Sequence, residues 1–260
     1  MVKMQTKIQN YKRVEKAFDK SLEQLDLEGH RIITLAENAR LRIQEGINSD
    51  ISRNGNYTRE GFLYVPGQPN KLVRKSPILD SPVEATQAHR YGNEFYISQE
   101  QLEQVIGSGF YELQDKTFYI PTNRFKEEGL TVFAFGTTEG KNLNQDQRDA
   151  EEYGLFLKEA GIKEMPVWLV DRDYVNRQKG PFARQLWFDG LDSGSSLNGD
   201  DWGLNCDCRV LGVPKEAGEG MQKSLELYSI QDIKRVLKAK GLTGLEKVLI
   251  DGIIKSHEIQ

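Results

Sequence analysis

The stretch DGLDSGSSLNGDDWGLNCDC, residues 189–208, differs in composition from the rest of the chain. Sixteen of its twenty residues are Asp, Gly, Ser, Asn or Cys, and both cysteines of the sequence, Cys206 and Cys208, lie in it. Lys, Glu and Gln make up 60 of the 260 residues, so a window of this length should hold four or five of them, and this window holds none. Chance therefore does not explain the choice of residues.

Apolar residues within and around this stretch predict that it is anchored to a core. Gly, Asn, Asp and Ser dominate ordinary turns, so a plain surface loop is the simplest interpretation. However, Leu191, Leu197 and Leu204 recur inside the stretch, and the apolar runs FARQLWF (182–188) and RVLGV (209–213) flank it. A linker without structure does not need such anchors. We therefore predict an ordered segment, with a plain polar loop as the alternative.

The choice of residues also follows a rule at the level of codons. Replacing the adenines of Asn codons, which are AA followed by a pyrimidine, gives Asn, Asp, Ser, Gly and Cys among others. It never gives Lys, Glu, Gln or Met, because their codons end in a purine. The residues missing from 189–208 are the ones that this rule forbids, and the two cysteines are among those it permits. Trp202 does not derive from such a codon.

With this composition, and with Gln185-Leu-Trp-Phe188 opening the segment, the chain resembles the variable proteins of diversity-generating retroelements, especially the archaeal and archaeal-virus members. These proteins have a C-type-lectin-type fold whose ligand-facing residues are rewritten by adenine-directed mutagenesis. Arg209-Val-Leu-Gly-Val213 is similar to their closing strand. The resemblance covers residues 165–213 and extends over 57–213, without the N-terminal region. In many members the variable region ends the chain, whereas 47 residues follow it here.

The resemblance implies two roles for the residues of this region. A scaffold set would hold the backbone; it comprises Leu186, Trp187, Phe188, Gly190, Leu191, Leu197, Gly199, Leu204 and Val210. A displayed set would vary and bind the ligand; it comprises Asp189, Asp192, Ser193, Asn198, Asp200, Asp201, Asn205, Cys206, Asp207 and Cys208, with Trp202, which fits either set, grouped here. The acidic character of the displayed set favours a basic or hydrogen-bonding ligand.

The residues before and after this region predict helices. Apolar residues at helical spacing over the first fifty positions, from Ile8 to Ile43, predict a helical arm over 1–56. The same stripe could instead form a coiled-coil seam and produce a homo-oligomer. Residues 214–260 are predicted to form a helical tail.

Residues 57–213 alternate short strands with a helix, so the predicted fold class is α+β. The resemblance implies that these residues form a C-type-lectin-like domain between the helical arm and the helical tail. Aromatic and β-branched runs bounded by Gly, Pro or Asn predict strands over 61–65, 94–97, 109–113, 117–120, 130–135 and 165–170. A helix is predicted over 146–160, ending at Gly161.

Composition excludes several classes of protein. The net charge of −4 without a basic cluster argues against nucleic acid as partner. No apolar run approaches the ~20 residues needed to cross a bilayer. The N-terminus has no apolar core of a signal peptide, which predicts a cytoplasmic or virion-associated protein. Three scattered histidines and two cysteines predict neither a metal nor a cofactor, and the aspartates do not match a calcium loop.

The sequence therefore predicts a ligand-binding protein that is not an enzyme, whose partner is an unknown protein or cell-surface ligand. One alternative is a structural or assembly protein in which 189–208 is an ordinary loop. Another is an enzyme of the formylglycine-generating kind, which shares the fold family and uses a reactive cysteine. Acidic surroundings would raise the pKa of such a thiol, which disfavours the second alternative.

Overall fold

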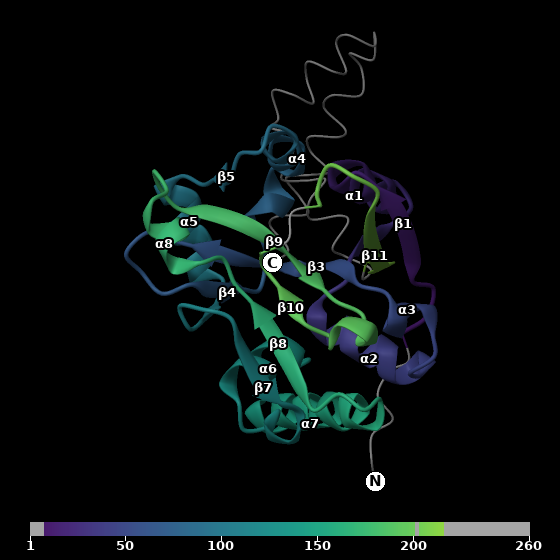
Figure 1. Cartoon of the computed structure of the whole chain (residues 1–260). Coiled ribbons are helices and arrows are strands. Elements are labelled where there is room, and N and C mark those ends of the chain that lie inside the picture. Colours follow the sequence, from purple (N-terminus) through teal and green to yellow (C-terminus); the bar gives the residue numbers. More distant parts are fainter. Residues whose placement is uncertain (1–7, 201–202, 216–260) are drawn as a thin grey trace, which may run out of the picture. The chain divides into compact units, whose positions relative to one another are not determined.

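The computed structural model describes residues 8–200 and 203–215 (Figure 1). Within these ranges a mixed sheet forms the centre, with strands in the order β1 (Lys12–Lys16), β11 (Cys208–Pro214), β3 (Asn56–Tyr64), β9 (Phe182–Phe188), β10 (Leu197–Asn198), β8 (Glu164–Trp168) and β7 (Phe118–Pro121). Shorter strands pair onto this path: β2 (His30–Ile32) on β11, β4 (Lys71–Val73) on β3, β5 (Phe95–Tyr96) on β9 and β6 (Phe110–Glu112) on β4.

Helices cover both faces of this sheet and bury two hydrophobic clusters. One cluster joins α2 (Leu35–Glu45), α6 (Gly129–Phe135) and α7 (Leu143–Glu159) to β8 and β9. The other joins α1 (Phe18–Leu27), α4 (Pro82–Arg90) and α5 (Gln99–Gly107) to β3 and β11. Strand β9 supplies both clusters because alternate side chains point to opposite faces of a sheet. The remaining helical turns are α3 (Asp50–Arg53), α8 (Arg172–Asn176), η1 (Pro77–Asp80), η2 (Thr122–Arg124) and η3 (Leu191–Ser193).

The prediction of an uninterrupted helical arm over residues 1–56 is wrong. Helices α1 and α2 are present, but β1 and β2 interrupt the region and both pair with β11. Gly29, at φ +73°, follows α1 in the left-handed conformation that stops a helix. The stripe residues Phe18, Leu25 and Ala39 are buried within the domain core, so they are not available for a coiled-coil seam. Residues 8–56 therefore pack as part of the domain.

Most of the predicted strands and the long helix lie where they were predicted, but one predicted strand is a helix. Residues 130–135, expected as a strand, form helix α6. Five of its seven residues are buried, and a short apolar run that is buried on most sides looks the same in a helix and in a strand. The predicted tail over 214–260 lies outside the described residues beyond Lys215. In the described ranges, no helix combines the length and the apolar character that a membrane span requires.

A buried carboxyl group of β3, which binds the first residue of α2, makes stability depend on pH. Glu60 of β3 is buried and accepts a hydrogen bond from the Leu35 backbone N–H at 3.0 Å. Burial raises the pKa of Glu60 from 4.5 to about 7. The native state therefore binds more protons than the unfolded state between these two values, so stability falls as pH rises through this window and is level above it.

We expect Glu60→Gln to remove this dependence, because the amide keeps a hydrogen-bond acceptor for Leu35 and does not ionise. Urea unfolding at a series of pH values from about 4.5 to about 8 measures it. A Gln variant whose stability falls as steeply as that of the parent chain would contradict the assignment.

Candidate ligand-binding surface

Backbone hydrogen bonds hold the segment 189–200 in one path across the domain. After β9 ends, the chain makes the turn η3 and returns as β10, which pairs antiparallel with β9 and parallel with β8. The backbone N–H of Asp189 donates to Ser196 O, that of Ser195 donates to Gly190 O, and that of Gly199 donates to Trp168 O, each at 3.0 Å. This part of the stretch is therefore ordered structure attached to the sheet.

Apolar side chains and close backbone contacts fix the predicted scaffold set. Leu186, Phe188, Leu197, Leu204 and Val210 are buried, while Trp187 and Leu191 are half-buried and pack against the clusters. The two glycines of the set lie where a side chain would not fit. A Cβ atom on Gly190 would lie 1.9 Å from the Arg53 carbonyl oxygen, and one on Gly199 would lie 2.4 Å from the Phe62 ring.

Most described members of the displayed set point into solvent. Asp192, Ser193, Asp200, Asn205, Cys206 and Asp207 are exposed, and Asn198 is partly exposed. Asp189 is half-buried instead, and its carboxylate accepts hydrogen bonds from Trp187 Nε1 at 2.8 Å and from the Ser196 hydroxyl. Asp201 and Trp202 lie outside the described residues.

The expectation that Cys208 is displayed is wrong. Cys208 is the first residue of β11 and is 3% exposed, on the face that carries Val210 into the second hydrophobic cluster. The alternation of β11 turns the Cys208 side chain inward, on the same side as Val210. Its Sγ donates to Gly203 O at 2.6 Å, and the exposed Cys206 Sγ donates to the same oxygen at 2.8 Å. Burial, together with the neighbouring Cys206, raises the pKa of the Cys208 thiol to about 12. A thiol with this pKa is a poor nucleophile at neutral pH.

The two thiols should consequently react at different rates with an aromatic disulfide reagent. We expect Cys206 to react rapidly in the native protein, and Cys208 to react only after unfolding, because it is buried and protonated. Absorbance of the released thiolate counts the two steps. Cys206→Ser should remove only the fast step, and two equally fast thiols in the native protein would contradict this placement.

A buried arginine that sequence analysis did not identify clamps the segment. Arg42 of α2 is fully buried, and its Nη1 donates to Asp189 O at 2.8 Å and to Ser195 Oγ at 2.9 Å. Its Nη2 donates to Phe188 O at 3.3 Å, and its guanidinium carbon lies 3.9 Å from the centre of the Phe188 ring. Tyr153 completes the network, 2.6 Å from Ser195 Oγ. Arg42 thus binds both ends of the turn that η3 makes.

Helical spacing in the sequence indicates the burial of Arg42, although not the contacts that it makes. Arg42 follows Leu35 by seven residues, which places both on one face of a helix, and that face is the buried one. Burial lowers the pKa of Arg42, and hydrogen bonds to carbonyl and hydroxyl oxygens compensate for the lost water.

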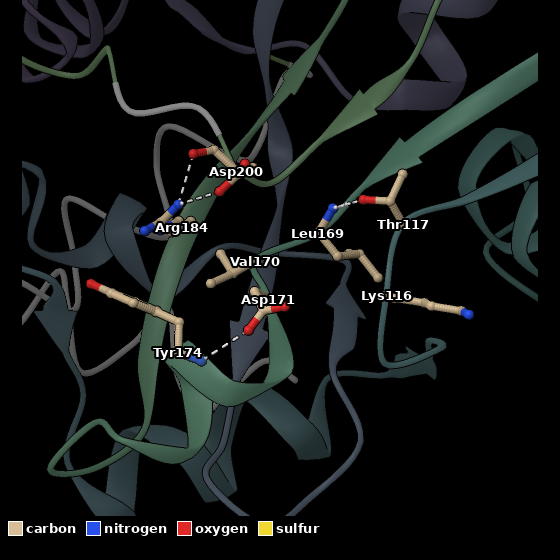
Figure 2. Close-up of a pocket in the computed structure, with 8 residues that line it drawn as sticks. All are labelled: Lys116, Thr117, Leu169, Val170, Asp171, Tyr174, Arg184 and Asp200. Atoms are coloured by element: carbon tan, nitrogen blue, oxygen red, sulfur yellow. Dashed lines mark hydrogen bonds and ion pairs between the residues drawn. The ribbon is translucent and has the colours of Figure 1, made fainter.

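A pocket of about 610 Å³ lies where β8 and β10 end, next to exposed Asp200 (Figure 2). It is lined by Lys116, Thr117, Leu169, Val170, Asp171, Tyr174, Arg184 and Asp200. Arg184 is almost fully buried, and its Nη2 binds the Glu94 carboxylate at 2.6 Å. Its Nη1 donates to the carbonyl oxygen of Asp200 at 2.7 Å and to the carboxylate of Asp200 at 3.2 Å. Tyr174 OH donates to Glu94 at 2.8 Å. A buried ion pair therefore fixes the position of Asp200 at the rim. Sequence analysis did not identify this pocket.

Metal ligands are not gathered at this surface: the described ranges contain no group of three or more His, Cys, Asp or Glu side chains placed to hold an ion. No protein-family model matches the sequence, and no curated protein matches it. Among solved structures, the chain is similar to a protein whose structure is described as the accommodation of massive sequence variation in Nanoarchaeota by the C-type lectin fold. The match has a TM-score of 0.58 at 15% sequence identity, over 80% of this chain and 100% of that one.

This chain has the C-type lectin fold. The match confirms the α+β class and the C-type lectin-like fold that the resemblance implied. In this C-type lectin fold, the strands β9, β10 and β8 run side by side through the middle of Figure 1, and the segment 189–200 connects two of them. Within this segment, Asp192, Ser193 and Asn198 are thus held next to the central sheet.

Proposed function

We propose that the protein is a ligand-binding protein whose displayed set forms a variable recognition surface on a C-type lectin scaffold, and that a retroelement diversifies this surface. The observation that carries the proposal is the separation of roles along 186–210. Backbone contacts, apolar anchors and Arg42 hold the chain, while the side chains of Asp192, Ser193 and Asn205 to Asp207 are exposed.

The physical chemistry of such a surface supports recognition. Substitutions at exposed positions usually change stability by only about ±0.5 kcal/mol, whereas buried Leu or Phe side chains contribute roughly 1.5–3 kcal/mol each. A protein built in this way can change what it binds without losing its fold, as loops on an immunoglobulin scaffold do. The nanoarchaeal protein of similar fold is described as accommodating massive sequence variation, which agrees with this use of the fold.

The ligand of this proposal is a protein or a cell-surface molecule, and the protein acts by binding and not by catalysis. Its exposed Asp192, Asp200 and Asp207 favour a basic or hydrogen-bonding ligand over nucleic acid or an anionic membrane. The buried, protonated Cys208 disfavours a reaction that needs a thiolate at this position.

Sequencing of the DNA around the gene tests the diversification. The proposal expects a near-identical second copy of the segment that encodes 189–208, differing from the first at adenines, together with a gene for a reverse transcriptase. A gene without this copy, whose natural variants differ at third bases and at positions other than adenines, would contradict it and would favour an ordinary loop.

A further inference from the structure

Two exposed aromatic side chains lie beside the segment, on the outer face of the sheet. Tyr119 of β7 is 53% exposed and Trp168 of β8 is 38% exposed, and their rings meet edge to face with centroids 6.2 Å apart. Their neighbours Ile120 and Val167 point the other way, into the core. An aromatic pair in this position contributes little to the core, and tyrosine and tryptophan are enriched among the residues that dominate binding energies.

The register of the strands extends this pair into the segment. Trp168 is the partner of Asn198 between β8 and β10, and Asn198 is the partner of Trp187 between β10 and β9. Partners on adjacent strands project from the same face of a sheet. Tyr119, Trp168, Asn198 and Trp187 therefore form one row, here called the aromatic row, in which Asn198 is the one member of the displayed set.

The pocket lies at the ends of β8 and β10, where Trp168 and Asn198 are the last residues of their strands, and two carboxylates belong to its lining. The chain leads from Trp168 into Leu169, Val170 and Asp171, and from Asn198 to Asp200, and all four of the residues reached line the pocket.

Asp171 and Asp200 are exposed, and each uses one carboxylate oxygen within the domain. Asp171 Oδ1 caps α8 by accepting from the Asp173 and Tyr174 N–H groups, and Asp200 Oδ1 accepts from Arg184, whose guanidinium also binds buried Glu94. The second oxygen of each carboxylate accepts no hydrogen bond from the described residues, so it can bind a cation. Lys116 is the other cation of the lining, and Figure 2 shows its side chain extending away from both aspartates.

We propose that the aromatic row and the pocket together bind an arginine-bearing segment of a protein partner, with the guanidinium between Asp171 and Asp200 and its stem against Trp168. This inference rests on the proposed function and names the chemistry of its ligand. Arginine fits better than lysine because its planar guanidinium has N–H donors on more than one edge, so it can bind two carboxylates at once, whereas the lysine ammonium is a compact point charge. Tyr119, Trp168 and Asp171 lie outside 189–208, so this part of the site stays constant when the segment varies, whereas Asp200 belongs to the displayed set and varies with it.

The pocket volume agrees with this occupant. Pockets that hold small ligands usually measure about 300–1,000 Å³, and the 610 Å³ found here lies within that range. The apolar side chains of Leu169 and Val170 contact the stem of a bound arginine, and the carboxylates at the rim bind its charged end. A charged hydrogen bond of this kind contributes about 1.5–3 kcal/mol, so losing one weakens binding about tenfold or more.

The test is a titration of the full ¹⁵N-labelled chain with N-acetyl-arginine amide, followed by NMR. Trp168→Phe identifies the indole N–H signal of Trp168. The expected result is a saturable shift of this signal and of the Asp171 amide, which weakens as salt is added. N-acetyl-citrulline amide is the matched control probe, because it has the same shape and no charge, and it should cause little shift.

Variants make the test specific. Asp171→Asn with Asp200→Asn should weaken the binding of the arginine probe about tenfold or more. Asp173→Asn, an exposed aspartate of α8 that does not line the pocket, should leave it unchanged. The NMR spectrum of each variant reports that it is folded. Equal shifts with the citrulline probe, no saturable shift at Trp168, or unchanged affinity in the double variant would overturn the inference.

Failure of this inference can be distinguished from failure of the proposed function. A second copy of the segment in the flanking DNA, together with no binding of the arginine probe, would refute the arginine site alone. Binding of the probe without such a copy would support the site and refute diversification by a retroelement.

Discussion

Replacing Arg42 with methionine is expected to lower the free energy of unfolding by about 3–5 kcal/mol. Methionine fills much of the space of the arginine stem but donates no hydrogen bonds. The carbonyl oxygens of Phe188 and Asp189 would then lose a donor, as would the Ser195 hydroxyl, in the protein interior. Each buried acceptor left without a partner costs about 1–3 kcal/mol. The attraction between the guanidinium and the Phe188 ring is lost as well.

Arg148→Met is the matched control for this substitution, because Arg148 is an exposed arginine in the middle of α7. We expect that control to change stability by no more than about 0.5 kcal/mol. Chemical denaturation of both variants, followed by circular dichroism, gives the comparison. Equal stabilities for the Arg42 and Arg148 variants would show that the segment does not depend on the clamp.

Gly190→Ala is expected to cost about 3 kcal/mol, which is at the upper end of the cost of overpacking. The backbone of Gly190 is not in the left-handed region, so the cost does not come from its conformation. The cost comes from a steric clash, because the new methyl group would lie 1.9 Å from the Arg53 carbonyl oxygen and 2.5 Å from the carbonyl carbon. These are backbone atoms of α3, so a rotation of a side chain cannot relieve the contact, and η3 must separate from α3.

Gly180→Ala provides the control for this change, because a Cβ at Gly180 meets no atom within 4 Å and the residue precedes the same strand, β9. We expect it to leave the stability unchanged or to raise it by up to about 1 kcal/mol, since alanine lowers the entropy of the unfolded chain. Thermal unfolding of both variants measures the difference. A Gly190 variant with the same melting temperature as the Gly180 variant would contradict the close packing of η3 on α3.

The spacing of apolar residues was sufficient to predict the helices and strands in which buried residues recur at a helical or strand interval. The run from Thr117 to Ile120 and the helix around Tyr153 are of this kind. Strand β1 could not be predicted in this way, because four of its five residues are exposed charged side chains around Val14. Its position depends on the edge of β11, whose backbone groups need a partner that a local pattern does not reveal.

For the candidate site, the sequence predicted the segment and most of its exposed positions but not its supports. The alternation of β11 decides the burial of Cys208, and this register is set by pairing with β1 and β3. The clamp by Arg42 joins residues that are more than 140 positions apart in the sequence. The pocket likewise brings together Lys116, Asp171 and Asp200 from separate segments. Contacts of this range are products of the fold, so composition and local spacing do not contain them.

The most direct test of the account compares two libraries of the full chain by the resistance of each member to protease. One library randomises exposed positions of the displayed set: Asp192, Ser193, Asn205, Cys206 and Asp207. The other randomises buried positions of the scaffold set: Leu186, Phe188, Leu197, Leu204 and Val210. We predict that most members of the first library remain folded, with changes of about ±0.5 kcal/mol for each substitution, and that most members of the second do not, because truncating a buried Leu costs about 2–5 kcal/mol. Equal losses in the two libraries would contradict the claim that this protein fixes a backbone in order to leave its recognition side chains free to change.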